Sequence, residues 1–114
     1  MISTWKILEN IEQLDQAIQD SHQKPIVFFK HSVTCGISAK AKFMLEQGWG
    51  FDEDLFDFYY LDLLSNRAIS NEIANRFNVH HKSPQIIILK GGKSVKDMSH
   101  HRISASSLKN ALDK

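Results

Sequence analysis

The chain contains one cysteine, Cys35, and its side chain offers the most reactive chemistry in the sequence. The thiolate, and not the thiol, is the nucleophile in thiol-disulfide exchange. Because there is no second cysteine, no internal disulfide is possible, and any redox step must join Cys35 to another molecule. Ser38 stands where a Cys-x-x-Cys redox motif would have its second cysteine. The sequence therefore predicts a monothiol site.

The residues around Cys35 favour its thiolate form. A polar turn precedes it and good helix formers follow, so we expect Cys35 at the start of a helix, where unpaired N–H groups and the helix dipole typically lower a cysteine pKa. Ser38, one turn into this helix, could donate a hydrogen bond to the thiolate, or merely satisfy its own turn. Lys30 and His31 could assist if they point inward. The alternative is that Cys35 is a small buried apolar residue.

The histidines and aromatic residues suggest less chemistry. The pairs His80-His81 and His100-His101 lack the spacing of a zinc motif, and neighbouring side chains on a strand point to opposite faces. We therefore expect solvated surface histidines and no dedicated metal site. The aromatic run 56–60 has no interleaved basic residues, so it favours a core strand over a platform for stacking bases.

Strands and helices alternate along the chain and must position Cys35. The pattern of apolar residues predicts strands at residues 4–8, 26–29, 56–61, 85–90 and 93–98. It predicts helices at 11–21, from Cys35 to the break at Gly48-Trp49-Gly50, at 66–78, and from Ser104 or Ser106 to Leu112.

Short signals mark where these elements end. Asn10 and Gln13 form a capping-box pattern, and Asn78 suits the left-handed end of a helix. Gly91-Gly92 indicates a tight hairpin. The continuous apolar run 26–29 is typical of a central parallel strand that is buried on both faces.

This order of elements predicts an α/β fold in which helices cover both faces of the sheet. Ligands of such sheets bind at the carboxyl ends of strands, which is where Cys35 is expected. The chain has 114 residues, 42% of them hydrophobic, and a net charge of +1, which indicates a single domain over residues 1–114 with no footprint for nucleic acid or an anionic membrane. Its apolar runs are too short to span a bilayer, and the first ten residues lack a secretory signal, so we expect a cytoplasmic protein, which we take as a monomer.

Several segments resemble a known family. The element order, the helix-initial Cys35 and the proline before strand 85–90 are similar to the thioredoxin fold, a central mixed sheet with helices on both faces. Residues 30–39, 70–74, 81–85 and 99–100 resemble the bacillithiol-system redox protein family of the YtxJ type, which comprises monothiol bacilliredoxin-like proteins. These segments span most of the chain.

The resemblance implies that the protein removes bacillithiol, a low-molecular-weight thiol, from mixed disulfides with protein cysteines. Cys35 matches the nucleophile of the family, and Thr34, Gly36 and Ser38 occupy positions that would support its thiolate. Bacillithiol would be a co-substrate and no cofactor would be tightly bound. The implied partners are bacillithiolated client proteins and a thiol that regenerates Cys35.

The bond between Ser83 and Pro84 is informative under this resemblance. Propensity alone favours the trans form. The resemblance implies a cis bond, with the backbone of Ser83 facing the cysteine and pairing with the substrate as a strand would. The sequence departs from the common family form at Gly36, where proline often follows the cysteine, and glycine loosens the first helical turn.

Two other functions remain open from the sequence. Residues 35–38 also resemble the Cys-Gly-Phe-Ser signature of monothiol glutaredoxins, which bind a bridging iron-sulfur cluster with glutathione. We rank this carrier function second, because the first family fits residues 70–74 and 83–85 better. The third possibility is a thioredoxin-fold interaction module in which Cys35 is buried and inert.

Overall fold

The computed structural model describes residues 1–113, in which five strands and four α-helices follow one another in the predicted order. The strands are β1 (Lys6–Ile7), β2 (Ile26–His31), β3 (Asp57–Asp62), β4 (Gln85–Lys90) and β5 (Lys93–Ser99). The helices are α1 (Ile11–Asp20), α2 (Gly36–Gln47), α3 (Arg67–Phe77) and α4 (Ala105–Leu112), with a short 3-10 helix η1 (His100–Arg102) before α4 that the sequence patterns did not predict.

The strands form one mixed sheet in the order β1-β3-β2-β4-β5. Strand β2 pairs in parallel with β3 and antiparallel with β4, while β4 and β5 form the predicted hairpin. The prediction that 26–29 is a central strand is therefore confirmed, but the strand is parallel to only one of its two neighbours, because the chain enters β4 after α3 at the end of the sheet where β2 finishes.

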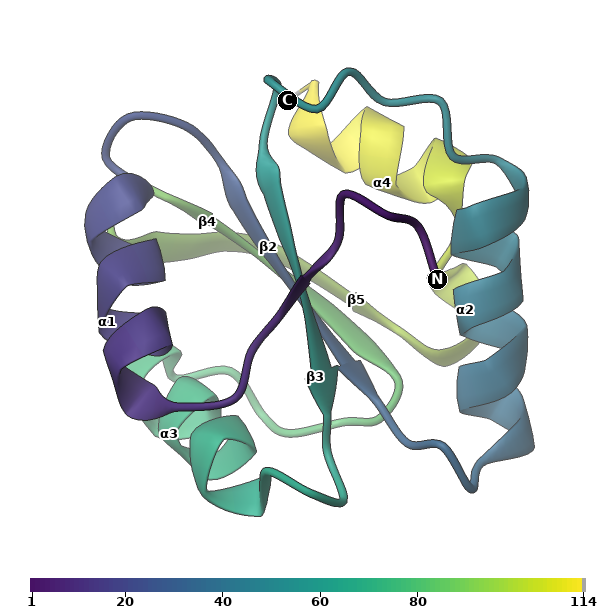
Figure 1. Ribbon diagram of the computed structural model, residues 1–114, viewed down its shortest axis with the longest axis horizontal. Helices are drawn as coiled ribbons and strands as arrows, with labels where there is room; N and C mark the ends of the chain where they lie inside the picture. Colours follow the sequence, from purple (N-terminus) through teal and green to yellow (C-terminus); the bar gives the residue numbers. More distant parts are fainter. Residues whose placement is uncertain (114) are drawn as a thin grey trace.

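Two layers of helices cover the sheet, with α1 and α3 on one face and α2 and α4 on the other (Figure 1). We call these the α1/α3 face and the α2/α4 face. Side chains along β2 alternate between them: Ile26 and Phe28 belong to the core under α1 and α3, whereas Val27 and Phe29 belong to the core under α2 and α4. The predicted α/β fold, with helices on both faces of the sheet, is confirmed.

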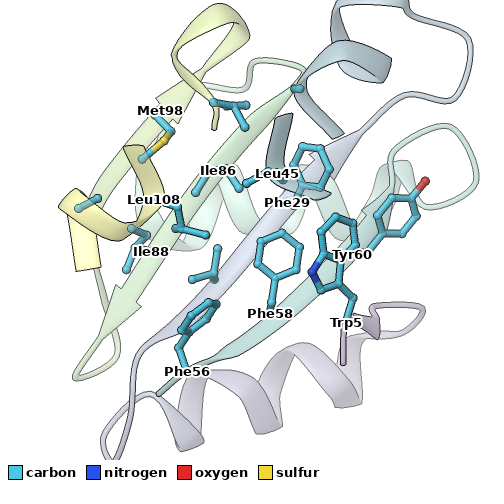
Figure 2. Close-up of a cluster of buried hydrophobic side chains, with 14 residues drawn as sticks. Trp5, Phe29, Leu45, Phe56, Phe58, Tyr60, Ile86, Ile88, Met98 and Leu108 are labelled. Atoms are coloured by element: carbon cyan, nitrogen blue, oxygen red, sulfur yellow. The ribbon is translucent and has the colours of Figure 1, made fainter. Parts of the chain in front are cut away.

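Aromatic side chains dominate the core of the α2/α4 face (Figure 2). The Trp5 ring lies 4.6 Å from that of Phe58 and 6.2 Å from that of Phe29, measured between ring centroids. Trp49 packs edge-on against Trp5 at 5.4 Å. The predicted core role of the run 56–60 is confirmed, since each of its residues is buried and Tyr59 alone of its aromatics joins the opposite core.

Local signals predicted most of the element ends. Asn10 and Gln13 form both hydrogen bonds of the capping box, Asn78 ends α3 with a φ of 53°, and Ser104 rather than Ser106 caps α4. Strand β1 is shorter than predicted and Ile7 is 38% exposed, because β1 is an edge strand that pairs only with β3. None of the helices in residues 1–113 has the length and apolar composition that a membrane crossing requires.

Candidate active site

Cys35 lies at the junction between β2 and α2, as predicted. It is the N-cap residue of α2, its backbone is extended (φ −105°, ψ 124°), and its side chain makes no capping hydrogen bond. Its N–H donates to the carbonyl of Ser32 at 3.2 Å, and its own carbonyl accepts from the N–H of Ala39 at 3.0 Å. The thiol is free and partly exposed. The structure therefore does not favour a fully buried, inert cysteine.

Hydroxyl groups shape the turn before Cys35. Ser38 is fully buried, and its hydroxyl oxygen accepts from the N–H of Ser32 at 3.1 Å. The hydroxyls of Ser32 and Thr34 lie 3.3 Å apart. Neither Thr34 nor Ser38 is hydrogen-bonded to the sulfur within residues 1–113, and a hydroxyl that accepts one bond still has a proton to donate. Their support of the thiolate stays a prediction, and the role that the structure gives them is to hold the turn.

Gly36 is the first residue of α2 and is exposed. A Cβ at this position would meet no atom within 4 Å. Glycine is therefore not needed here for space, and the departure from the common family form is sterically neutral.

The bond between Ser83 and Pro84 is cis, as the resemblance implied. Lys30, near the end of β2, pairs with Gln85, the first residue of β4. The turn that carries Cys35 and the loop that carries Ser83 therefore lie at the same end of these two strands. The carbonyl of Pro84 accepts from the N–H of His100 at 3.1 Å. Within residues 1–113 the N–H and carbonyl of Ser83 make no hydrogen bond.

His31 lies beneath α2 as a buried imidazole. It is 4% exposed, and its ring packs 5.4 Å from Tyr60 and 5.5 Å from Phe29. Burial and, to a lesser degree, the charge of Lys42 lower the pKa of His31, while Asp62, the backbone of Ser38 and Glu46 act in the opposite direction. A ring with a lowered pKa is neutral at pH 7, so His31 does not assist the thiolate by adding a positive charge.

Lys30 points to the other side of the sheet. Its side chain is fully buried on the α1/α3 face, where its ammonium donates to the carbonyl of Ser70 at 3.1 Å and lies 3.3 Å from Nδ1 of His81. Burial lowers the pKa of Lys30 from 10.5 to about 8. The condition under which Lys30 could assist Cys35 is not met, because β2 alternates its side chains and Lys30 shares the face of Phe28.

Sequence reasoning missed the partnership of Lys30 with Ser70 and His81. The available signal was a lysine at the end of an apolar run, since such a residue is rarely buried without partners. The prediction of solvated histidines is right for His80, His100 and His101, which are exposed, and wrong for His81. Among residues 1–113, no three or more His, Cys, Asp or Glu side chains gather as potential metal ligands.

Exposed apolar side chains flank the thiol. Val33 is 60% exposed and Ile37 is 43% exposed, on either side of Cys35 in the chain. Ile37 also lines a groove of about 560 Å³ between α2, β5, η1 and α4. The basic residues of this groove are Lys40, Lys96 and Arg102, and its one acidic residue is Asp97. The surface around Cys35 therefore offers apolar contacts next to a basic groove.

Comparisons with known proteins agree with this geometry. The family model described as "Monothiol bacilliredoxin BrxC" matches residues 6–108. One solved structure, described as a thioredoxin-fold protein proposed to be an oxidoreductase, is 35% identical, with a TM-score of 0.80, and the match covers 95% of this chain and 93% of that one.

Two thioredoxins are more distant. The thioredoxin Mala s 13 of Malassezia sympodialis is 18% identical, with a TM-score of 0.75 over 97% of this chain and 89% of that one. The short form of spinach chloroplast thioredoxin f is also 18% identical, with a TM-score of 0.70 over 98% of this chain and 93% of that one. At this identity the two show the fold alone, and the predicted thioredoxin fold is confirmed.

Proposed function

The chain belongs to the monothiol bacilliredoxin family, whose thioredoxin fold supports a redox role, and we propose that it removes bacillithiol from mixed disulfides with protein cysteines. The observation that carries this proposal is Cys35 itself, a single, partly exposed thiol at the N-terminus of α2. The first N–H groups of a helix have no partner within the helix, and they favour a negative charge at this position.

The transfer needs one nucleophile and no external oxidant or reductant. The thiolate of Cys35 attacks the bacillithiol sulfur of the mixed disulfide. A new S–S bond joins Cys35 to bacillithiol while the original S–S bond breaks, and the client cysteine leaves as a thiolate. Because the chain has no second cysteine, a thiolate from another molecule must then attack the bacillithiol sulfur of the adduct. Cys35 leaves as a thiolate, and bacillithiol departs in a disulfide with the attacking thiol.

Ser83 and the apolar residues beside Cys35 would hold the client. The free N–H and carbonyl of Ser83 suit an extended client segment, which would pair with them as an added strand. Val33 and Ile37 would cover apolar side chains next to the client cysteine. We propose bacillithiol as the co-substrate, no tightly bound cofactor, bacillithiolated proteins as partners and a reducing cytoplasm as the setting, since the cycle depends on free thiols.

Intact mass spectrometry tests the proposal directly. We expect the reduced protein to take one bacillithiol from a bacillithiol-modified model protein, and to react much more slowly with the glutathione-modified form of the same protein. The Cys35→Ser variant is the control and should acquire no adduct. Failure to acquire an adduct from either donor would overturn the oxidoreductase proposal.

Two simple observations separate the alternatives. A bridged iron-sulfur cluster absorbs visible light, so a coloured protein on anaerobic purification would favour the cluster carrier that residues 35–38 also suggest. Slow alkylation of native Cys35 at neutral pH would favour an inert interaction module. The partial exposure of Cys35 argues for rapid alkylation.

A further inference from the structure

Lys30 is a buried cation on the face of the sheet that α2 does not cover. Its side chain is fully buried, and its ammonium donates to the backbone carbonyl of Ser70 on α3 at 3.1 Å. Its second neighbour is Nδ1 of His81, at 3.3 Å, in the loop between α3 and β4. The ammonium therefore joins three parts of the chain, namely the end of β2, the helix α3 and the loop that leads to Ser83.

The ring of His81 serves as an acceptor in this cluster. An ammonium has only donors, so Nδ1 must carry a lone pair and the proton of the neutral ring lies on Nε2. Burial and the charges of Lys30, Arg67 and His80 all lower the pKa of His81, which keeps the ring neutral. The hydroxyl of Ser70 lies 3.4 Å from the same Nδ1 atom.

Gln85 fixes the same loop from the neighbouring strand. It pairs with Lys30 across the antiparallel ladder, so the two side chains share one face of the sheet. Its amide nitrogen donates to the carbonyl of His80 at 3.0 Å, and its amide oxygen accepts from the N–H of Lys82 at 3.4 Å. Lys30 and Gln85 thus hold consecutive residues of the segment that ends at Ser83.

Such a cation is expensive to bury. An ammonium in the interior is costly even when it is hydrogen-bonded, and apolar residues of similar volume are often at least as stable. Lys90, the last residue of β4, provides a contrast with Lys30, because it is only partly buried. It lies at the end of β4 away from Ser83, where its ammonium donates to the carbonyl of Leu112 at 3.2 Å. Stability alone therefore does not explain a lysine at position 30.

We propose that Lys30 is a positioning residue that holds the peptide of Ser83 in place for the client chain through His81. Lys30 contacts the loop and not the thiol, so it sets how well the client binds and leaves the reactivity of Cys35 unchanged. This inference rests on the proposed function, in which the client pairs with Ser83.

Two reactions of the same thiol test this division. Iodoacetamide is small and needs no contact with Ser83, whereas transfer from a bacillithiol-modified protein does. For Lys30→Met we expect alkylation of Cys35 within about twofold of the wild-type rate. Transfer should fall about tenfold at low client concentration and recover at saturating client, since misplacement of a binding group weakens binding strongly. The matched control, Lys90→Met, should leave both rates unchanged.

A double-variant cycle tests whether the effect passes through His81. His81→Leu alters the loop side of the contact without touching β2. If Lys30 acts through His81, the double variant loses no more transfer activity than the single variants, because both remove one interaction. Effects that multiply, an unchanged transfer rate in Lys30→Met, or an equal fall in alkylation and transfer would each overturn the proposal.

Amide hydrogen exchange keeps this test separate from the proposed function. The N–H of Lys82 is the reporter, since it donates to the side chain of Gln85. In Lys30→Met and in His81→Leu we expect faster exchange of the Lys82 amide than in the wild-type protein, and Lys90→Met should not change it. This readout does not depend on bacillithiol. Failure of the wild-type protein to accept bacillithiol would therefore overturn only the proposed function, whereas unchanged exchange of the Lys82 amide would overturn the role of Lys30.

Discussion

The two faces of the sheet are built differently although β2 contributes alternate residues to both. The α2/α4 face, which supports the helix of Cys35, is a continuous aromatic cluster around Trp5, Phe29 and Phe58. The α1/α3 face has a mainly aliphatic core. At the end of β2 it also contains the buried ammonium of Lys30 with its partners Ser70 and His81. Apolar packing supports the helix that follows Cys35, whereas the polar contacts of Lys30 support the loop that leads to Ser83.

This difference would give the site one rigid side and one adjustable side. Close-packed aromatic rings have few alternative arrangements, and Ala41 and Leu45 pack α2 into the same core that stabilises the fold. Hydrogen bonds of a buried ammonium depend on its protonation and on each partner. The loop at Ser83 can therefore respond to small changes that leave the helix of Cys35 in place.

The largest effect should come from truncating neighbouring phenylalanines of β2. Phe28 and Phe29 are both fully buried but lie on opposite faces. Phe29 packs against the rings of Trp5, Phe58 and Tyr60, whereas Phe28 pairs with Tyr59.

We expect Phe29→Ala to lower the free energy of unfolding by about 4–5 kcal/mol and Phe28→Ala by about 3–4 kcal/mol, because aromatic pairs add to the cost of the cavity. Urea denaturation measures both values. A larger loss for Phe28→Ala would break the contrast between the faces.

The next effect is a pH dependence of the free energy of unfolding, which arises from Lys30 on the α1/α3 face. Burial lowers the pKa of Lys30 from 10.5 to about 8, so between these values the unfolded chain keeps a proton that the folded protein has lost. The free energy of unfolding should therefore rise with pH through this window, by up to about 3 kcal/mol, and the full cost of the buried charge applies below it.

Lys30→Met removes this contribution. We expect the difference in the free energy of unfolding between wild type and variant to change across pH 8 to 10.5, as measured by urea denaturation. Tyr59 and Tyr60, whose pKa values are raised mainly by burial, titrate in both proteins and cancel in the difference. A constant difference over this range would show that the ammonium carries no such cost.

A smaller effect compares the N-cap residues of α1 and α2. The side chain of Asn10 caps α1 by accepting from the N–H of Gln13 at 2.8 Å, whereas Cys35 leaves α2 without a side-chain cap. We expect Asn10→Ala to lower the free energy of unfolding by about 1 kcal/mol. We expect Cys35→Ser to raise the free energy of unfolding by about 0.5–1 kcal/mol and to abolish transfer. Thermal unfolding monitored by circular dichroism tests both. Destabilisation by Cys35→Ser would contradict an open N-cap.

The smallest effect concerns the second residue of the motif. Gly36 is the first residue of α2, and the extended backbone of Cys35 suits a residue before proline. A Cβ at Gly36 meets no neighbour within 4 Å. We expect Gly36→Pro to raise the free energy of unfolding by about 0.4–1 kcal/mol, because it restricts the unfolded chain. A decrease in urea denaturation would show that the glycine is needed for the turn.

Local patterns predicted the elements well because each depends on nearby residues. The apolar run of β4, the capping box of α1 and the hairpin at Gly91-Gly92 all appear in the structure as expected. The length of the edge strand β1 was overestimated, since the alternation of Trp5 and Ile7 does not show how many neighbouring strands β1 pairs with. The direction of Lys30 stayed open in the sequence for a related reason, because its surroundings depend on which helices cover each face of the sheet.

The sequence alone was enough to establish a monothiol site, since a chain with one cysteine allows no internal disulfide, and to place the start of a helix at Cys35 through local propensity. The groups that meet around this site follow from the packing of the chain. Ser70 and His81 lie 40 and 51 residues from Lys30 in the chain, and the packing of α3 on the sheet brings them to its ammonium. Such contacts between distant residues follow from topology and burial, which no local pattern of residues encodes.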